Sequence, residues 1–184
     1  MRSKVIAVLV SLALIITASI VMTQTDKLPE FKDPNLLIRK TNRTLELYDG
    51  NKKIKTYKVV LGFDTKGDKE IEGDGRTPEG EFYVFAKNPE SKFHLSLGIS
   101  YPGIEDARRG LKEKLISLEE YDEIVAAIAE KRIPLQKTKL GGEIYIHGGG
   151  TDSDWTDGCI ALKNEEMTEL FDAIPIGAKV KVLP

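Results

Sequence analysis

The chain has 184 residues, with 27 Lys or Arg, 29 Asp or Glu and a formal net charge of −2 at pH 7. Its 41% hydrophobic and 30% charged residues are typical of a globular protein and argue against a disordered chain. Because basic residues are not in surplus, we expect no nucleic-acid partner.

The N-terminus has the pattern of a targeting segment. Arg2 and Lys4 precede an apolar run over residues 5–22, interrupted only by three hydroxyl side chains. Residues 1–25 are therefore predicted to be a signal anchor or a cleaved signal peptide, and we favour the anchor, with residues 5–22 in the cytoplasmic membrane. Arg2 and Lys4 would stay cytoplasmic, which places the rest of the chain in the cell envelope, on the periplasmic side. Residues 26–34 are predicted to form a polar linker.

A domain is predicted over residues 35–184, and its first half has the alternation of β-strands. A Gly-, Asp- and Lys-rich loop fills residues 62–80, without the Gly-Lys-Ser/Thr ending of a phosphate-binding loop. The predicted strands of this half cover residues 36–39, 44–48, 54–61, 81–86 and 92–100.

The second half mixes helices and strands. Residues 104–132 are predicted to be helical, with a capping box at Ser117–Glu120 and an apolar stripe that packs on the sheet. A strand over residues 143–147 delivers His147 at its end. A helix over residues 165–173, capped by Asn164, and a strand over residues 178–183 complete the domain.

The only cysteine, Cys159, and one of the two histidines, His147, lie twelve positions apart, each beside glycine. A thiol becomes a nucleophile when its proton is removed, and imidazole is the usual base near neutral pH. Glycine beside a nucleophile allows close approach of a substrate to the backbone. A buried, inert cysteine is the alternative, which the residues around Cys159 and the presence of His147 disfavour.

Two motifs resemble one known family. His147-Gly148 followed by Thr156-Asp157-Gly158-Cys159, with Thr77-Pro78-Glu79-Gly80-Glu81-Phe82 upstream, resembles the L,D-transpeptidase catalytic domain, also called YkuD. The resemblance covers about residues 34–184. It implies a β-rich α+β fold of mixed β-sheets with a few helices, and a catalytic domain over residues 35–184.

The resemblance also implies a reaction. Cys159 attacks the third-residue carbonyl of a peptidoglycan stem tetrapeptide, D-Ala leaves, and the thioester passes to an amine, which gives a cross-link or an attached wall protein. His147 activates the thiol, and backbone N–H groups around Gly158-Cys159, with that of Gly148, hold the oxyanion. Neither a metal nor another cofactor is expected. Thr156, Asp157 and Trp155 are further candidates for substrate contact.

Several alternatives remain at this point. Asp157 and Ala161 stand where many family members have His and Arg or Asn, so a hydrolase that cleaves wall peptide or wall-protein links is one alternative. A non-catalytic wall-binding module is another. His94 is predicted to be either a satisfied strand histidine or a residue at the rim of the site. The loop at Thr77-Pro78 is interpreted as scaffold.

The sequence weighs against two other kinds of site. His147 to Gly150 looks like the oxyanion loop of an esterase, but the Gly-x-Ser-x-Gly nucleophile motif of that class does not occur in the sequence. A zinc site would combine His94, His147 and Cys159, which do not have a standard ligand spacing.

Overall fold

The computed structural model describes residues 28–184. The predicted targeting segment, with its 5–22 span, lies outside the described residues, as does the first part of the predicted linker. Within residues 28–184, no helix is long and apolar enough to cross a membrane.

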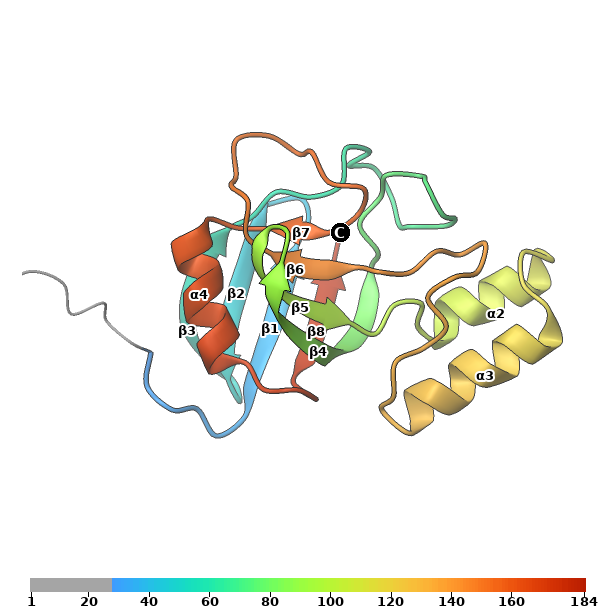
Figure 1. Cartoon of the computed structure of the whole chain (residues 1–184), viewed down its shortest axis with the longest axis horizontal. Coiled ribbons are helices and arrows are strands. Elements are labelled where there is room, and N and C mark those ends of the chain that lie inside the picture. Colours follow the sequence, from blue (N-terminus) through green and yellow to red (C-terminus); the bar gives the residue numbers. More distant parts are fainter. Residues whose placement is uncertain (1–27) are drawn as a thin grey trace, which may run out of the picture.

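The described residues form a curled β-sheet with three helices (Figure 1). This is the β-rich α+β fold that the sequence predicts, and its strand alternation follows the predicted pattern. The strands are β1 (Pro34–Arg39), β2 (Thr44–Asp49), β3 (Lys52–Lys58), β4 (Gly80–Ser91), β5 (His94–Ile99), β6 (Tyr145–His147), β7 (Ile160–Ala161) and β8 (Lys179–Leu183). The helices are α2 (Ile104–Lys112), α3 (Leu118–Ala129) and α4 (Asn164–Ala173).

The sheet is mixed and closes on itself. Its strand order is β3-β2-β1-β8-β4-β5-β6-β7, with parallel pairs only at β1–β8 and β6–β7 among the described strands. The two edges then meet, because Val60, just after β3, exchanges two backbone hydrogen bonds with Ala161 of β7, at 3.0 and 2.9 Å. We call this Val60–Ala161 contact the seam; it lies two residues from Cys159.

The core fills the inside of the curl. Alternate residues of β1, β2 and β8 point inward and are buried, as the strand pattern requires: Leu36, Ile38, Leu45, Leu47, Val180 and Val182. Helix α4 packs against β5 and β6 and adds Met167 and Leu170. Burial of each such side chain contributes about 1.5–3 kcal/mol, so a slip of register would be costly and the strands that carry the site are fixed.

Residues 100–144, inserted between β5 and β6, form a lobe beside the sheet that contains α2 and α3 (Figure 1). Its small core consists of Ala107, Ile116, Ile124 and Leu140. The prediction of one helix over 104–132 is wrong, because the capping box marks a start: the Ser117 hydroxyl accepts from Glu120 N at 3.1 Å, and α3 begins there. Lys114, with φ +59°, turns the chain between the helices.

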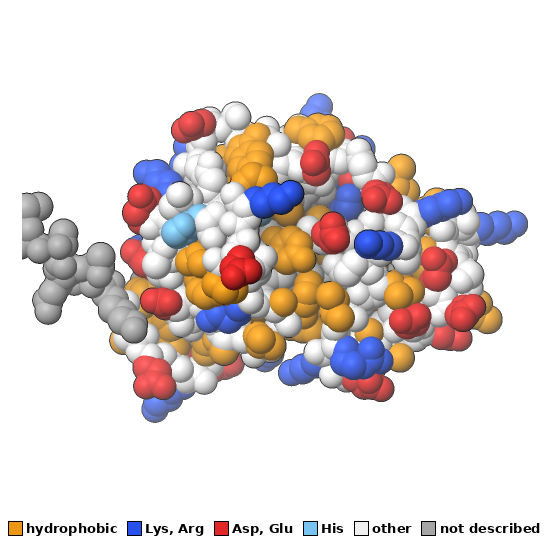
Figure 2. All heavy atoms as spheres, viewed as in Figure 1, with side chains coloured by type: hydrophobic (Ala, Val, Ile, Leu, Met, Phe, Trp, Pro, Cys, Tyr) orange, Lys and Arg blue, Asp and Glu red, His pale blue; other side chains and the backbone are white. Residues whose placement is uncertain are grey.

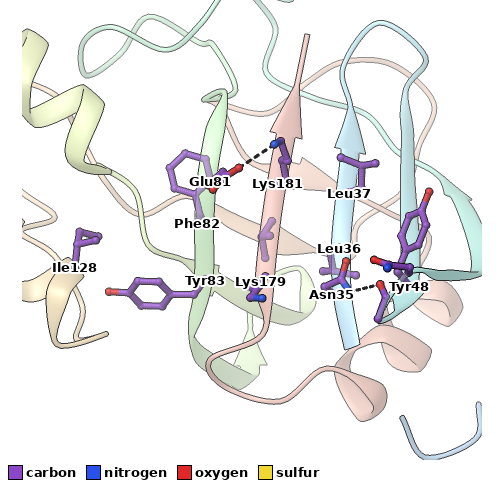
Figure 3. Close-up of a pocket in the computed structure, with 13 residues that line it drawn as sticks. Asn35, Leu36, Leu37, Tyr48, Glu81, Phe82, Tyr83, Ile128, Lys179 and Lys181 are labelled. Atoms are coloured by element: carbon purple, nitrogen blue, oxygen red, sulfur yellow. Dashed lines mark hydrogen bonds and ion pairs between the residues drawn. The ribbon is translucent and has the colours of Figure 1, made fainter. Parts of the chain in front are cut away.

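The outer face of β1, β8 and β4 is a solvent-facing groove of about 550 Å³ (Figure 3). Figure 3 shows Tyr83 reaching from β4 toward Ile128 of α3. The Tyr83 hydroxyl donates to the carbonyl of Arg132, three residues after α3, at 2.5 Å. This contact fixes the lobe against the sheet.

In the space-filling view, positive and negative side chains are intermixed over the lobe, without a patch of a single sign (Figure 2).

Candidate active site

Two parallel strands bring the predicted catalytic pair together. In the β6–β7 register, Ile146 lies opposite Ile160 and His147 opposite Ala161, which places Cys159 opposite Tyr145. Side chains two positions apart on a strand share a face, so Cys159 and His147 face the same side. Both line a cleft of about 990 Å³ between the sheet and the lobe.

His147 is oriented by its neighbour in sequence. Its Nδ1 lies 2.6 Å from the Gly148 carbonyl oxygen, and because a carbonyl only accepts, Nδ1 carries the proton. Nε2 is therefore the nitrogen that can accept a proton. The side chain is only 3% exposed, and burial lowers its pKa below the ordinary value. The imidazole is thus held as a neutral base.

Cys159 rests as a protonated thiol. Its sulfur lies 3.6 Å from the Glu143 carbonyl, to which the thiol donates, and 3.4 Å from Tyr145 N, which donates to it. The pKa of the thiol is raised to about 11, chiefly by burial; the Asp157 and Glu143 carboxylates also raise it, while the Tyr145 N–H and Lys69 lower it. The thiol and the imidazole that line this cleft are thus both uncharged at rest.

Thr156 shapes the turn that carries the nucleophile. Its hydroxyl accepts from Gly158 N at 3.2 Å and donates to the Cys159 carbonyl at 2.7 Å. Gly158 has φ +125°, and a Cβ there would lie 2.6 Å from the Arg76 carbonyl oxygen, so only glycine fits. Thr156 is buried, which makes it a structural residue of this turn.

Two of the predicted oxyanion donors, Gly158 and Gly148, have partners within the protein. Gly158 N–H donates to Thr156, and Gly148 N–H donates to the Leu95 carbonyl at 3.3 Å. Among residues 28–184, the N–H of Cys159 has no such partner. The oxyanion role of Gly158 and Gly148 stays a prediction that requires them to exchange partners, whereas Cys159 N–H needs no exchange.

The 62–80 loop packs against the turn that carries Cys159. Gly62 N donates to the Thr77 hydroxyl at 3.0 Å, and the buried Lys40 ammonium donates to the Thr77 carbonyl at 2.8 Å. A Cβ on Gly62 would lie 3.2 Å from Cα of Gly158, so the loop and the turn are in close contact. These contacts agree with the interpretation of Thr77-Pro78 as scaffold.

The walls of the cleft differ in chemistry. On one side Trp155, 37% exposed, and Phe93 present aromatic surface. On the other side, the segment that returns from the lobe presents the exposed side chains of Lys137 and Lys139. Asp157 is exposed at the mouth of the cleft beside the nucleophile. The cleft therefore offers both ammonium and carboxylate groups to a substrate.

The structure also places Ala161 and His94. Ala161 is 0% exposed and bonded to Val60 across the seam, so position 161 is closed to a substrate carboxylate. His94 does not line the cleft; its Nε2 lies 2.8 Å from the Thr168 hydroxyl, which favours the satisfied surface histidine. In residues 28–184, no group of three or more His, Cys, Asp or Glu is arranged to hold a metal.

Two residues of the site were missed from the sequence. Phe93 stacks on His147, and the Asn164 side-chain oxygen accepts from Gly149 N at 2.9 Å. Asn164 was predicted to be the cap of α4, but Lys163 is the N-cap residue and Asn164 is the first residue of the helix. Its amide is thus free to bind the loop after His147. The sequence contains no signal for either contact.

Comparisons with known proteins agree with this geometry. The family model of the L,D-transpeptidase catalytic domain, YkuD, matches residues 33–182. The helical cell shape determining protein Pgp2 from Campylobacter jejuni is 25% identical, with TM-score 0.58 over 89% of this chain and 52% of that chain. A point mutant of Pgp2 is 26% identical, with TM-score 0.57 over 85% of this chain and 49% of that chain. Bd1075 from Bdellovibrio bacteriovorus is 20% identical, with TM-score 0.54 over 83% of this chain and 48% of that chain.

The chain spans about half the length of these solved structures. No curated protein matches the chain at a significant level. The family match includes Cys159, His147 and the Thr77-Pro78 segment, and extends over most of the chain. This chain belongs to the L,D-transpeptidase catalytic domain family, YkuD.

Proposed function

We propose that this protein is a cysteine acyltransferase that acts on peptidoglycan stem peptides. One observation carries the proposal: Cys159 and His147 line one cleft, with Nδ1 of His147 bound to a carbonyl, so that Nε2 is the basic nitrogen. Peptidoglycan peptides are the substrates of the family, and the cleft has room and mixed charge for an extended peptide.

Acylation begins with proton transfer. His147 Nε2 takes the thiol proton as the Cys159 sulfur attacks the carbonyl carbon of the third residue. A carbon–sulfur bond forms, and the carbonyl oxygen becomes an oxyanion held by backbone N–H donors, with that of Cys159 available. Collapse of this intermediate breaks the carbon–nitrogen bond, and His147 returns the proton to the departing amine of D-Ala.

Deacylation determines the product. An amine acceptor that gives up its proton to His147 attacks the thioester carbon and restores the Cys159 thiol, leaving a new amide. Water in place of the amine gives a free carboxylate instead. Exposed Lys137 and Lys139 are suited to the carboxylates of stem peptides, and Asp157 beside the thiol is suited to an ammonium group. Cross-linking, attachment of a wall protein and hydrolysis share the same acyl-enzyme.

We further propose that the enzyme works outside the cytoplasmic membrane, where its substrate lies, held there by residues 5–22. Pgp2, one of the proteins it resembles, is described as determining helical cell shape, and we propose a role in cell shape for this chain as well. A non-catalytic wall-binding module is disfavoured, since both reactive side chains are retained.

Defined muropeptides provide the test. The domain over residues 28–184 is incubated with a purified tetrapeptide muropeptide, with and without a second stem as acceptor, and the products are resolved by mass spectrometry. Cross-linked dimer supports transpeptidation, and free tripeptide alone supports hydrolysis. Cys159→Ser, with a less acidic nucleophile, should remain folded and lose turnover. A near-normal rate in Cys159→Ser would falsify the mechanism.

A further inference from the structure

The tip of the β4–β5 hairpin lies over the catalytic histidine. The Phe93 ring stacks on the His147 ring, with centroids 4.7 Å apart and planes 24° apart. The Trp155 ring meets the same imidazole edge-on, with centroids 5.6 Å apart, and its centroid lies 5.2 Å from that of Phe93. Phe93 is 43% exposed, whereas the imidazole beneath it is 3% exposed. Two half-open aromatic rings therefore separate a buried base from water.

The hairpin tip is fixed to the segment that it covers. Phe93 N donates to the Ser91 hydroxyl at 3.2 Å, and His94 has φ +75°, a left-handed turn that β-strands do not use. The Gly148 N–H bonds to the strand just beyond the tip. A Cβ on Gly148 would lie 2.8 Å from the Phe93 carbonyl oxygen, so the tip and the His147-Gly148 segment are in direct backbone contact.

A second connection reaches helix α4. The His94 ring bonds to the Thr168 hydroxyl at 2.8 Å, and that hydroxyl donates to the Asn164 carbonyl at 3.0 Å. The Asn164 side chain holds Gly149, as described above. The hairpin tip, α4 and the loop after His147 are therefore joined in one network, and Phe93 is delivered by a rigid element.

We propose that Phe93 is a positioning residue that holds the His147 ring in its reactive orientation. The proposal rests on the assignment of His147 as the base. One hydrogen bond, from Nδ1 to the Gly148 carbonyl, fixes one edge of the imidazole, but a half-turn about the Cβ–Cγ bond would break it and put carbon atoms where Nδ1 and Nε2 now lie. The stacked face blocks that rotation and excludes water that would compete for Nε2.

The pattern of contacts favours positioning over two simpler roles. A core residue would be buried, and Phe93 is not. A residue that serves only as a wall for substrate has no need to stack nearly parallel on the base at 4.7 Å. If Phe93 positions the base, its loss should lower kcat, because a misplaced general base slows the chemical step while the cleft still binds substrate.

The test uses four variants. Phe93→Ala removes the stack, and Phe93→Leu replaces it with an apolar side chain in case the alanine variant does not fold. Phe93→Tyr preserves the ring. Phe63→Ala is the matched control, since Phe63 is 57% exposed and packs on Gly75 instead.

Two readouts are measured. The first is the rate of acylation of Cys159 by a tetrapeptide muropeptide, as kcat and KM. The second is the pH titration of the His147 ring by nuclear magnetic resonance in a Cys159→Ala background, with His94→Gln to assign the two histidines. Other titratable groups near the base are Cys159, Asp157, Glu143, Tyr145, His94 and Lys69; all but Cys159 are retained throughout the Phe93 titration series.

For Phe93→Ala and Phe93→Leu we expect kcat to fall about 10- to 100-fold, with KM changed less than about twofold. The pKa of His147 should rise toward its ordinary value as the ring gains water, because burial is what lowers it. Phe93→Tyr and Phe63→Ala should match the wild type in both readouts. An unmoved titration in folded Phe93→Ala and Phe93→Leu, or a loss confined to KM, overturns the proposal. If no muropeptide is turned over, the proposed function fails, but the titration still tests the role of Phe93.

Discussion

The ionisation state of Cys159 is open to a direct measurement. Burial and nearby carboxylates raise the thiol pKa from an ordinary 9.0 to about 11. At pH 8 the thiolate fraction then falls from about one in ten to about one in a thousand. Alkylation by iodoacetamide follows the thiolate, so the wild-type rate should increase about tenfold per pH unit between pH 7 and pH 10, without a plateau.

Asp157→Asn removes one of the carboxylates that raise this pKa. Its alkylation curve should shift to lower pH, while the midpoint stays above the ordinary value because burial is the largest cause and is retained. Asp152→Asn, an exposed neighbour in the same segment, is the control and should leave the curve in place. Intact-mass measurement of singly modified protein gives the rates. A plateau with a midpoint near pH 6 or 7 would indicate a resting thiolate–imidazolium pair and refute the neutral-pair reasoning.

Three further predictions follow from the hydrogen bonds of the site and of α2. Thr156→Val removes both hydrogen bonds of the Thr156 hydroxyl in the turn that carries Cys159. The free energy of unfolding should fall by about 1–3 kcal/mol, and the rate of single-turnover acylation should fall at least about tenfold. Asn164→Ala leaves Gly149 N without its acceptor and should lower the free energy of unfolding, measured with denaturant, by about 1 kcal/mol. An unchanged acylation rate in this variant would contradict a role of Asn164 in the site. Asp106 is buried with its pKa raised from 3.8 to about 6, so protonation favours the folded state. Protonation of Asp106 therefore raises the free energy of unfolding as pH falls from about 6 toward 4. Between pH 7 and pH 5 this increase is about 1.4 kcal/mol, and paired denaturant titrations should show that Asp106→Asn lacks it.

Covalent trapping gives an independent check of the nucleophile. The family resemblance leads us to expect that a carbapenem acylates Cys159, because its strained ring is opened by a thiol beside oxyanion donors. Intact mass should show one adduct, absent in Cys159→Ala. An adduct that persists in Cys159→Ala would place the reaction elsewhere.

The sequence predicts the parts of this fold in which local pattern and tertiary structure agree. The strand alternation of β1 and β8 reflects one buried face and one more accessible face, and this pattern is visible in the chain. The capping box at Ser117 predicts the start of α3, although the break before it was overlooked. The candidate pair, Cys159 and His147, stood out because its residues are scarce and lie beside glycine, and its catalytic role stays a prediction.

The remainder depends on contacts between distant segments. Strand β7 has two residues, too few for any alternation, and exists because β6 and Val60 flank it. Phe93 looked like part of a continuous strand, but a left-handed residue at 94 turns it onto the active site. The burial of Ala161 is equally non-local, since it follows from the closure of the sheet.

The seam between Val60 and Ala161 has a consequence for protein engineering. The Thr77-Pro78 segment follows one side of the seam and the nucleophile turn precedes the other, so the two motifs meet only when the sheet has closed. Neither motif can be grafted alone onto another scaffold with its geometry intact. A minimal transplant would need both edges of the sheet and the strands that bring them together, which is nearly the whole domain. Helices α2 and α3, which pack on each other around a small core of their own, are the part of the lobe best suited to exchange between relatives.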